Sequence, residues 1–339
     1  MCRALIVLLL VPVAVTGQGL PLFGNDATLR LTLEVPLSTL LRNAGERPVV
    51  QGKAAYIDGQ GSKISLPVAV STRGRSRLEI CRFPPLSLTF RKKDAQGTIF
   101  EGQKTLKLVT HCQRNKKFRG YVRQEYAIYE AFTVLTDISF RARYLDIEYR
   151  DSEKPGSNID EHGFLIESID ELASRTGLVR QKTPALSTGQ LDPGYTMLSA
   201  AFQYLVGNTD WSVKQGPEGS NCCHNGRPLS APDAAVGWKV VPYDFDQTGI
   251  INPDYAAPDA RFRLRSVRQR LWRGRCVHND ELDAVVGLFN ENRARIEAVL
   301  VIDGVPDARS TKRYIDTFFQ IINDPGRRQT NIEKRCLAD

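Results

Sequence analysis

Hydrophobic and polar residues alternate along much of the first half of the chain. In residues 28–35, leucine or valine stands at every second position, with polar or charged residues between them. A period of two is typical of a strand with one buried face and one solvated face. Runs of strand-like residues predict further strands at residues 49–57, 64–70, 86–90, 106–110, 144–149 and 163–167. The first hundred residues are therefore expected to be mainly antiparallel sheet.

The spacing of apolar residues lengthens between positions 121 and 135. Val122, Tyr126, Tyr129 and Leu135 recur at intervals that favour an amphipathic helix. Further helices are predicted at residues 169–175 and 194–206, from 279 or 280 to about 300, and from 310 to 324. A β-rich segment (residues 18–167) followed by an α-rich segment (residues 168–339) predicts an α+β protein with two lobes.

The first seventeen residues have the pattern of a secretory signal peptide. A short basic start precedes an apolar run from Ala4 to Val15, and small residues follow. An apolar run of about twelve residues is too short to cross a membrane. The protein is therefore expected to be soluble and exported, either periplasmic or secreted, with no membrane span.

Cysteine usage agrees with export. Six cysteines follow the apolar run: Cys81, Cys112, Cys222, Cys223, Cys276 and Cys336. An even number in an oxidising compartment favours disulfides. We expect Cys81 to pair with Cys112 and the other four to pair among themselves. A zinc site at residues 222–224 (Cys-Cys-His) is the alternative, although adjacent cysteines lack the usual gap between zinc ligands.

The chain is basic, with a formal net charge of +8, and seven arginines fall between residues 261 and 275. A basic patch can bind nucleic acid. No aromatic platform or nucleic-acid motif accompanies these arginines, and an exported protein rarely meets nucleic acid. We therefore expect a solvated basic face that attracts phosphate or an acidic substrate, and no nucleic-acid partner.

The strongest candidates for chemistry are carboxylates in the second half. An apolar run from Val240 stops on Asp244 and Asp246, and Asp210 lies in a polar turn behind a predicted helix. Carboxylates at the open end of a strand hold Mg²⁺ together with phosphate oxygens. Asp244 and Asp246, two residues apart, are expected to point the same way along the strand. The alternatives are a calcium site or polar turn there, and a helix-capping role for Asp210.

The chain offers candidates for the other parts of a phosphoryl-transfer site. Lys107 in a predicted strand is the candidate phosphate-binding lysine, and Glu125 on the next helix is its candidate partner. Arg73 in a glycine-containing loop is a further phosphate-binding candidate, and Asn225 is a candidate neutral metal ligand. Each has a plain alternative as a solvent-facing polar residue. Histidines without zinc-enzyme spacing and serines outside any Gly-x-Ser-x-Gly motif give a hydrolase little support.

In their order, several stretches resemble the spore-coat CotH kinase-like family, an atypical branch of the protein-kinase-like fold. They are residues 73–76 (Arg-Gly-Arg-Ser), 106–108 (Leu-Lys-Leu), 122–123 (Val-Arg), 163–167 (Gly-Phe-Leu-Ile-Glu), 207–212 (Gly-Asn-Thr-Asp-Trp-Ser) and 243–246 (Tyr-Asp-Phe-Asp). The likeness spans roughly residues 28–300. It implies a two-lobed kinase-like fold with a β-rich N-terminal lobe and an α-rich C-terminal lobe.

The resemblance also implies an activity: transfer of phosphate from ATP, with Mg²⁺ or Mn²⁺, to Ser or Thr of a secreted protein. By position, Asp210 would be the catalytic aspartate, Asp244 the main metal ligand, and Glu167 a cofactor-binding residue near the connection between the lobes. The sequence departs from the family at residues 83–87, Phe-Pro-Pro-Leu-Ser, where a lysine is expected, so Lys107 would have to serve. The expected asparagine after Asp210 is displaced by the cysteine-bearing insertion.

These departures keep a second function open, a catalytically inactive pseudokinase that acts as an envelope or extracellular binding protein. A metal-dependent hydrolase is a third possibility. The sequence leaves the acceptor substrate and the oligomeric state open.

Overall fold

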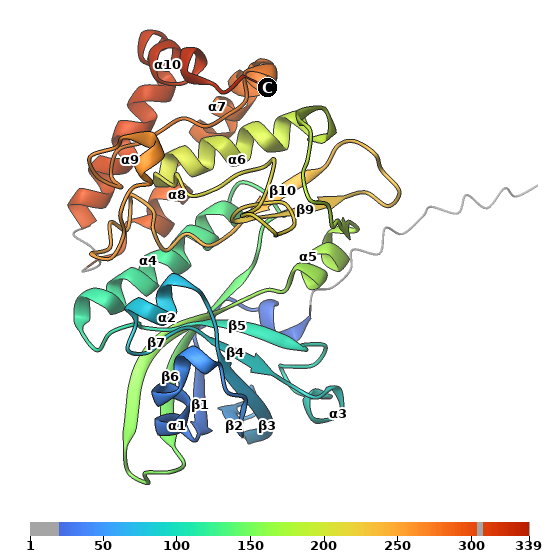
Figure 1. Ribbon diagram of the computed structural model, residues 1–339, viewed down its shortest axis with the longest axis vertical. Helices are drawn as coiled ribbons and strands as arrows, with labels where there is room; N and C mark the ends of the chain where they lie inside the picture. Colours follow the sequence, from blue (N-terminus) through green and yellow to red (C-terminus); the bar gives the residue numbers. More distant parts are fainter. Residues whose placement is uncertain (1–19, 304–307, 339) are drawn as a thin grey trace, which may run out of the picture.

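The computed structural model describes residues 20–303 and 308–338. The predicted signal peptide, residues 1–17, lies outside the described residues. A β-rich part and a helix-rich part lie one above the other in Figure 1. None of the helices in the described ranges is both long and apolar enough to cross a membrane.

Seven strands form a closed barrel in the order β1-β2-β3-β4-β5-β7-β6. They are β1 (Leu29–Val35), β2 (Val50–Ile57), β3 (Lys63–Thr72), β4 (Leu86–Thr89), β5 (Thr105–Val109), β6 (Ala142–Asp151) and β7 (Asn158–Ile166). Each overlaps one of the predicted strands, so the strand predictions are confirmed. The alternating side chains Leu31, Leu33 and Val35 are fully buried. They belong to a core cluster drawn mainly from the barrel strands.

The predicted two-lobed kinase-like fold is wrong, because the first seven strands close into a barrel. Closure comes from parallel pairing of β1 with β6, in which Leu31 lies opposite Ile147. A period of two shows which face of a strand is buried, but it does not show whether distant strands pair. The sequence pattern therefore predicted the strands and missed their closure.

The helices pack mostly beside and above the barrel (Figure 1). The longer ones are α4 (Lys116–Thr133), α5 (Ile169–Thr176), α6 (Pro193–Val206), α7 (Leu282–Glu291), α8 (Arg293–Leu300) and α9 (Ala308–Asn323). Short helices are α1 (Leu37–Arg42), α2 (Ser76–Ile80), α3 (Lys92–Ala95) and α10 (Pro325–Asn331). A separate sheet contains β8 (Val179–Arg180), β9 (Gly226–Ser230) and β10 (Lys239–Pro242). The single helix predicted from 279 or 280 to 300 is in fact a 3-10 turn followed by α7 and α8.

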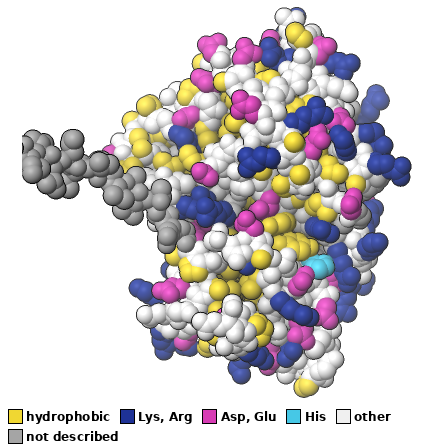
Figure 2. All heavy atoms as spheres, turned by 180° about the vertical axis from the view of Figure 1, so that it is seen from behind, with side chains coloured by type: hydrophobic (Ala, Val, Ile, Leu, Met, Phe, Trp, Pro, Cys, Tyr) yellow, Lys and Arg dark blue, Asp and Glu magenta, His cyan; other side chains and the backbone are white. Residues whose placement is uncertain are grey.

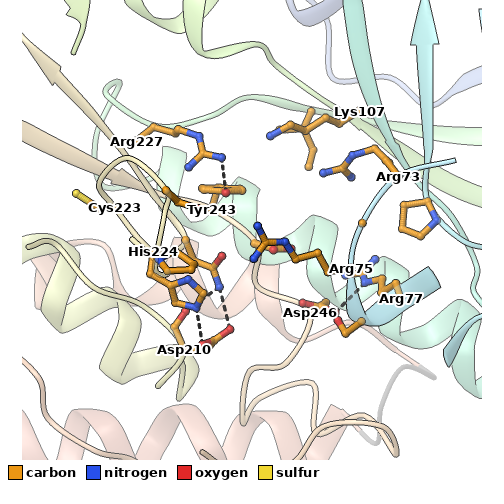
Figure 3. A pocket seen from close by; sticks show the side chains of 18 of the residues that line it. Arg73, Arg75, Arg77, Lys107, Asp210, Cys223, His224, Arg227, Tyr243 and Asp246 are labelled. Atoms are coloured by element: carbon orange, nitrogen blue, oxygen red, sulfur yellow. Dashed lines mark hydrogen bonds and ion pairs between the residues drawn. The ribbon is translucent and has the colours of Figure 1, made fainter. Parts of the chain in front are cut away.

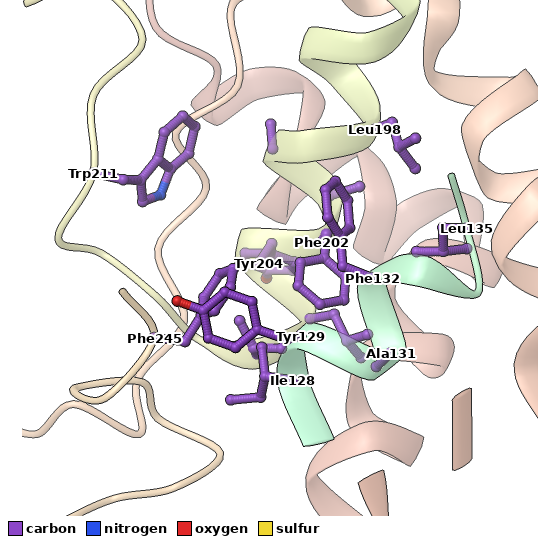
Figure 4. Close-up of a cluster of buried hydrophobic side chains, with 14 of the residues drawn as sticks. Ile128, Tyr129, Ala131, Phe132, Leu135, Leu198, Phe202, Tyr204, Trp211 and Phe245 are labelled. Atoms are coloured by element: carbon purple, nitrogen blue, oxygen red, sulfur yellow. The ribbon is translucent and has the colours of Figure 1, made fainter. Parts of the chain in front are cut away.

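An aromatic cluster joins α4 to α6 and to the chain after β10 (Figure 4). The rings of Phe132 and Phe202 lie 4.6 Å apart, and Phe245 packs against Tyr129 at 5.0 Å. Phe245 is 1% exposed. Because Phe245 is anchored in this core, the residues on either side of it are held at a fixed position above α4.

The arginine-rich segment is only partly the solvated face that was expected. Arg270 is half-buried and donates hydrogen bonds to the carbonyl oxygens of Tyr204 and Tyr314, at 2.8 and 2.6 Å. On the face shown in Figure 2, Lys and Arg side chains gather along one edge with acidic side chains among them. Part of the basic segment therefore serves packing, and the rest is solvated.

A buried histidine near the end of β5 gives a testable pH dependence. His111 is fully buried, packs on Phe83, and has no hydrogen-bond partner at either ring nitrogen. Burial lowers its pKa to about 4. The unfolded chain then binds the proton more readily, so stability falls as pH drops from about 6.5 towards 4. Between pH 7 and pH 5, His111 should cost the wild type about 2 kcal/mol of unfolding free energy. In His111→Phe this part of the loss should be absent, as measured by urea unfolding.

The matched control is Tyr149→Phe, which removes another buried polar group from the same aromatic cluster. Because this tyrosine does not titrate between pH 5 and 7, the variant should keep the decline of the wild type. An equal decline in His111→Phe would show that His111 does not cause it.

Candidate functional site

A cavity of about 630 Å³ lies between the barrel and the small sheet (Figure 3). Seven predicted site residues line it: Arg73, Lys107, Glu125, Asp210, Asn225, Asp244 and Asp246. The three aspartates thus share one cavity with Lys107 of β5 and Arg73 after β3. The catalytic and binding roles of these residues remain predictions.

The loop before α2 brings two arginines, Arg73 and Arg75, to the cavity. Its backbone is held on both sides: Arg73 N–H donates to the Pro85 carbonyl at 2.8 Å, and Arg47 donates to the Gly74 carbonyl at 2.7 Å. Gly74 has φ +103°, a conformation that side chains rarely adopt. Arg75 was not among the predicted site residues, although the Arg-Gly-Arg spacing carried a signal for it.

A disulfide anchors the far end of α2. Cys81, directly after the helix, bonds to Cys112, which lies three residues beyond β5. This pairing was predicted from the sequence and is confirmed. The disulfide ties α2 to the chain that follows the strand carrying Lys107.

Arg77 on α2 is the ionic centre of the cavity floor. Its Nη2 lies 2.7 Å from Glu125 Oε2, and its Nε lies 2.7 Å from Asp246 Oδ2. Glu125 was predicted to pair with Lys107, and this prediction is wrong. Both carboxylates are buried, and burial raises the pKa of each of them. Arg77 therefore holds together two acids, from α4 and from the loop after β10, that could not otherwise be buried as anions.

Lys107 faces the cavity without an ionic partner among the described residues. Its Nζ lies 4.7 Å from the centre of the Tyr243 ring, and Arg227 stacks on the same ring at 4.1 Å. Burial, together with the charges of Arg73 and Arg227, lowers the pKa of Lys107 to about 7. Asp244 is the anion that acts on Lys107, and it partly offsets this lowering. A surplus of close cations over anions favours binding of an anionic group. Arg227 was missed by the sequence reasoning, because nothing around it resembles a motif.

The lowered pKa of Lys107 predicts that anion binding weakens above pH 7. A neutral Lys107 must take up a proton when a polyphosphate binds, so affinity should fall by up to about tenfold per pH unit. Calorimetry with inorganic tripolyphosphate at pH 8, in two buffers of different ionisation enthalpy, should show uptake of about one proton. Lys107→Arg is the matched control, since arginine stays charged. Equal proton uptake in both proteins would contradict the prediction.

Asp210 is fixed in a turn beyond α6. Helix α6 ends at Val206, and the φ of +70° at the following Gly207, together with its close approach to Tyr314, requires glycine. The Asp210 carboxylate contacts His224 Nε2 at 2.7 Å and accepts a hydrogen bond from Asn225 Nδ2 at 3.0 Å. The hydrogen bond to Asp210 raises the pKa of His224. His224 was not predicted as a site residue, although it stands next to the cysteine pair.

Asp244 and Asp246 do not point the same way along a strand, as was predicted. Strand β10 ends at Pro242, and Asp244 has φ +67°. Its N–H donates to the Tyr129 hydroxyl at 2.9 Å, which fixes the turn. Asp244 is consequently exposed to the cavity, whereas Asp246 is buried against Arg77. The reason is the left-handed turn at Asp244, which breaks the period of two.

Glu167 is not among the residues that line the cavity, so its predicted cofactor-binding position is wrong. Both of its carboxylate oxygens accept hydrogen bonds from Arg175 at 2.8 Å, and one also accepts from the Arg141 N–H. A buried carboxylate with these partners is fully satisfied. Glu167 therefore joins β7 to α5 as a structural residue.

Cys222 and Cys223 form a disulfide with each other at the rim of the cavity, and Cys276 bonds to Cys336. The prediction that these four cysteines pair among themselves is confirmed. The alternative of a zinc site at residues 222–224 is therefore wrong. Within residues 20–303 and 308–338, no group of three or more His, Cys, Asp or Glu residues is placed to hold a metal ion.

The cavity does offer oxygen donors of the kind that Mg²⁺ prefers. Asp244 is exposed to it, and Asn225 uses its Nδ2 for Asp210, which leaves its Oδ1 as an acceptor. Mg²⁺ is usually held by one or two carboxylates together with substrate phosphates. These residues therefore fit a cation that enters with a phosphate group, in the cavity that Arg73 and Lys107 also line.

No known protein-family model and no curated protein matches this chain. The resemblance to the CotH kinase-like family thus stays a prediction from the sequence.

Proposed function

We propose that this protein binds ATP with Mg²⁺ or Mn²⁺ in the cavity and transfers phosphate to Ser or Thr of another exported protein. The observation that carries this proposal is the composition of one cavity: cations that make no ion pair within the described residues, above all Lys107, line it together with Asp210 and Asp244. Phosphoryl transfer depends mainly on positioning and on electrostatic stabilisation of the phosphates. The protein would supply positioning and electrostatic stabilisation through residues that are held in place by buried contacts.

Four cations would hold the phosphate groups: Arg73, Arg75, Lys107 and Arg227. One guanidinium group can donate two parallel hydrogen bonds to a phosphate. A lysine whose pKa is lowered takes up its proton again when an anion binds beside it. Arg77 is already engaged by two carboxylates and stays structural. The cation-lined wall thus binds and orients the donor.

Asp244 and Asn225 would hold the divalent cation, which neutralises phosphate charge when it is bound. Asp246 lies beside them, fixed by Arg77. Asp210 would accept the hydrogen bond of the acceptor hydroxyl and take its proton. His224 and Asn225 hold the Asp210 carboxylate in place for this role.

A second candidate function is a catalytically inactive binding protein. The observation in its favour is that both oxygens of the Asp210 carboxylate already have partners, His224 and Asn225. In that case the cavity would bind an anionic ligand without transferring phosphate.

Two measurements test the proposal. Thermal or urea unfolding with ATP and Mn²⁺ should show stabilisation of about 2.7 kcal/mol when the free ligand is at a hundred times its Kd. Incubation with γ-labelled ATP and exported proteins should then label Ser or Thr. Absence of any stabilisation by ATP–Mn²⁺ would overturn nucleotide binding, and stabilisation without labelling would favour the inactive binding protein.

We also propose that the protein is exported. The described residues contain three disulfides, which persist in oxidising compartments.

A further inference from the structure

A second cavity, of about 570 Å³, adjoins the first. The two cavities share three lining residues, Asp210, Pro217 and His224. The Asp210 carboxylate is 47% exposed, so a group in either cavity can reach it. The candidate base thus stands at the junction of two separate spaces, and only the first contains the cations assigned to the donor phosphates.

The second cavity is strongly basic. Its lining includes Lys214, Arg261, Arg273 and Arg275, and Asp210 is its only acidic member among the described residues. Lys214 has no ion pair within the described ranges. Burial, followed by the charge of Arg261, lowers the pKa of Arg273 to about 10. Cations this close to one another favour an anion between them.

The cations of this wall differ in exposure and in partners. Arg273 donates hydrogen bonds to the carbonyl oxygens of Thr209 and Trp211, which holds the turn that carries Asp210. Arg261 is 78% exposed and bonds to Asp259 on its own loop. Arg273 thus supports the turn of the candidate base, while Arg261 and Lys214 are open enough to solvent to contact a ligand.

We propose that the second cavity is the acceptor site, and that it takes peptide segments in which the reacting Ser or Thr is flanked by Asp or Glu. This inference rests on the proposed function. The hydroxyl would lie at Asp210, with the flanking carboxylates beside Lys214 and Arg261. Its oxygen bonds to the γ-phosphorus as the bond from phosphorus to the bridging oxygen of ADP breaks, and its proton passes to Asp210.

A binding experiment tests the charge preference without relying on turnover. Two labelled peptides of equal length contain one central Ser, flanked by Glu in the first and by Gln in the second. Fluorescence anisotropy should show at least tenfold tighter binding of the Glu peptide. The double variant Lys214→Gln/Arg261→Gln should reduce this preference to threefold or less, whereas Arg30→Gln, an exposed charge on β1 outside both cavities, should leave it unchanged.

Equal binding of the two peptides, or a preference that survives the double variant, would overturn the inference. A single-stranded oligonucleotide of matched charge that binds as tightly as the Glu peptide would also overturn it, because the site would then accept any polyanion.

A transfer assay with the same peptides separates this inference from the proposed function. Labelling of both peptides with equal efficiency would leave the kinase function standing and remove the acidic acceptor site. A binding preference for the Glu peptide without any labelling would support the peptide site and contradict the transfer function. Faster labelling of the Glu peptide than of the Gln peptide would support both the transfer function and the acidic acceptor site, provided that the double variant abolishes the difference by raising the KM for the Glu peptide.

Discussion

Asp210→Asn is expected to lower the rate of phosphoryl transfer at least a hundredfold, while the affinity for ATP–Mn²⁺ stays within about threefold of the wild type. Removal of a general base typically costs a factor of about 10² to 10⁴. The amide keeps the shape of the carboxylate beside His224 and Asn225. Because Asp210 contacts none of the cations assigned to the phosphates, donor binding should survive. Steady-state labelling gives kcat, and calorimetry gives the Kd for nucleotide.

The matched control is Asp160→Asn, which removes an exposed carboxylate from β7, away from both cavities. It should keep full activity. Comparable activity in Asp210→Asn and Asp160→Asn would defeat the assignment of the base. A large loss of nucleotide affinity in Asp210→Asn would instead show that Asp210 belongs to the donor site.

The convergence of the acids on one cavity could be predicted from local sequence. Asp210 follows a helix that stops at Val206, just before Gly207, and Asp244 follows a short apolar strand that stops at Pro242. When a buried helix or strand ends in a polar turn, the side chains of that turn lie at the edge of the hydrophobic core. The packing of Phe245 between Tyr129 and Phe202 then sets where the turn after β10 lies. Local pattern was sufficient here because each turn directly follows a buried element.

Pairings between distant elements could not be predicted in the same way. The role of Arg77 could not be predicted, because nothing near it in the sequence marks α2. In the structure it crosses to Glu125 on α4 and to Asp246, which lies 169 residues away. Barrel closure by β1 and β6 depends on a comparable long-range contact. Such contacts follow from the arrangement of whole elements, which periodicity alone does not describe.

Arg77→Met is expected to lower the free energy of unfolding by about 3–5 kcal/mol. Loss of one member of a buried ion network leaves its partners as uncompensated buried charges. Arg77 has two such partners, Glu125 and Asp246, whose side chains are only 4% and 9% exposed. Urea unfolding at pH 7 measures the loss. Glu125→Gln together with Asp246→Asn in the Arg77→Met background should recover part of it, because both charges are then removed.

The pH dependence and a surface control distinguish lost charge compensation from lost packing. Without Arg77, the folded-state pKa values of Glu125 and Asp246 rise further above their unfolded values of about 4. Carboxyl groups with raised pKa values stabilise the fold at low pH and cease to do so as pH rises. The defect of Arg77→Met should therefore be larger at pH 8 than at pH 5, and a defect of equal size at both would indicate packing alone. Arg293→Met removes an arginine that also bridges two carboxylates, Glu297 and Asp316, but at the surface. It should cost about 1 kcal/mol or less, because exposed ion pairs are screened by water.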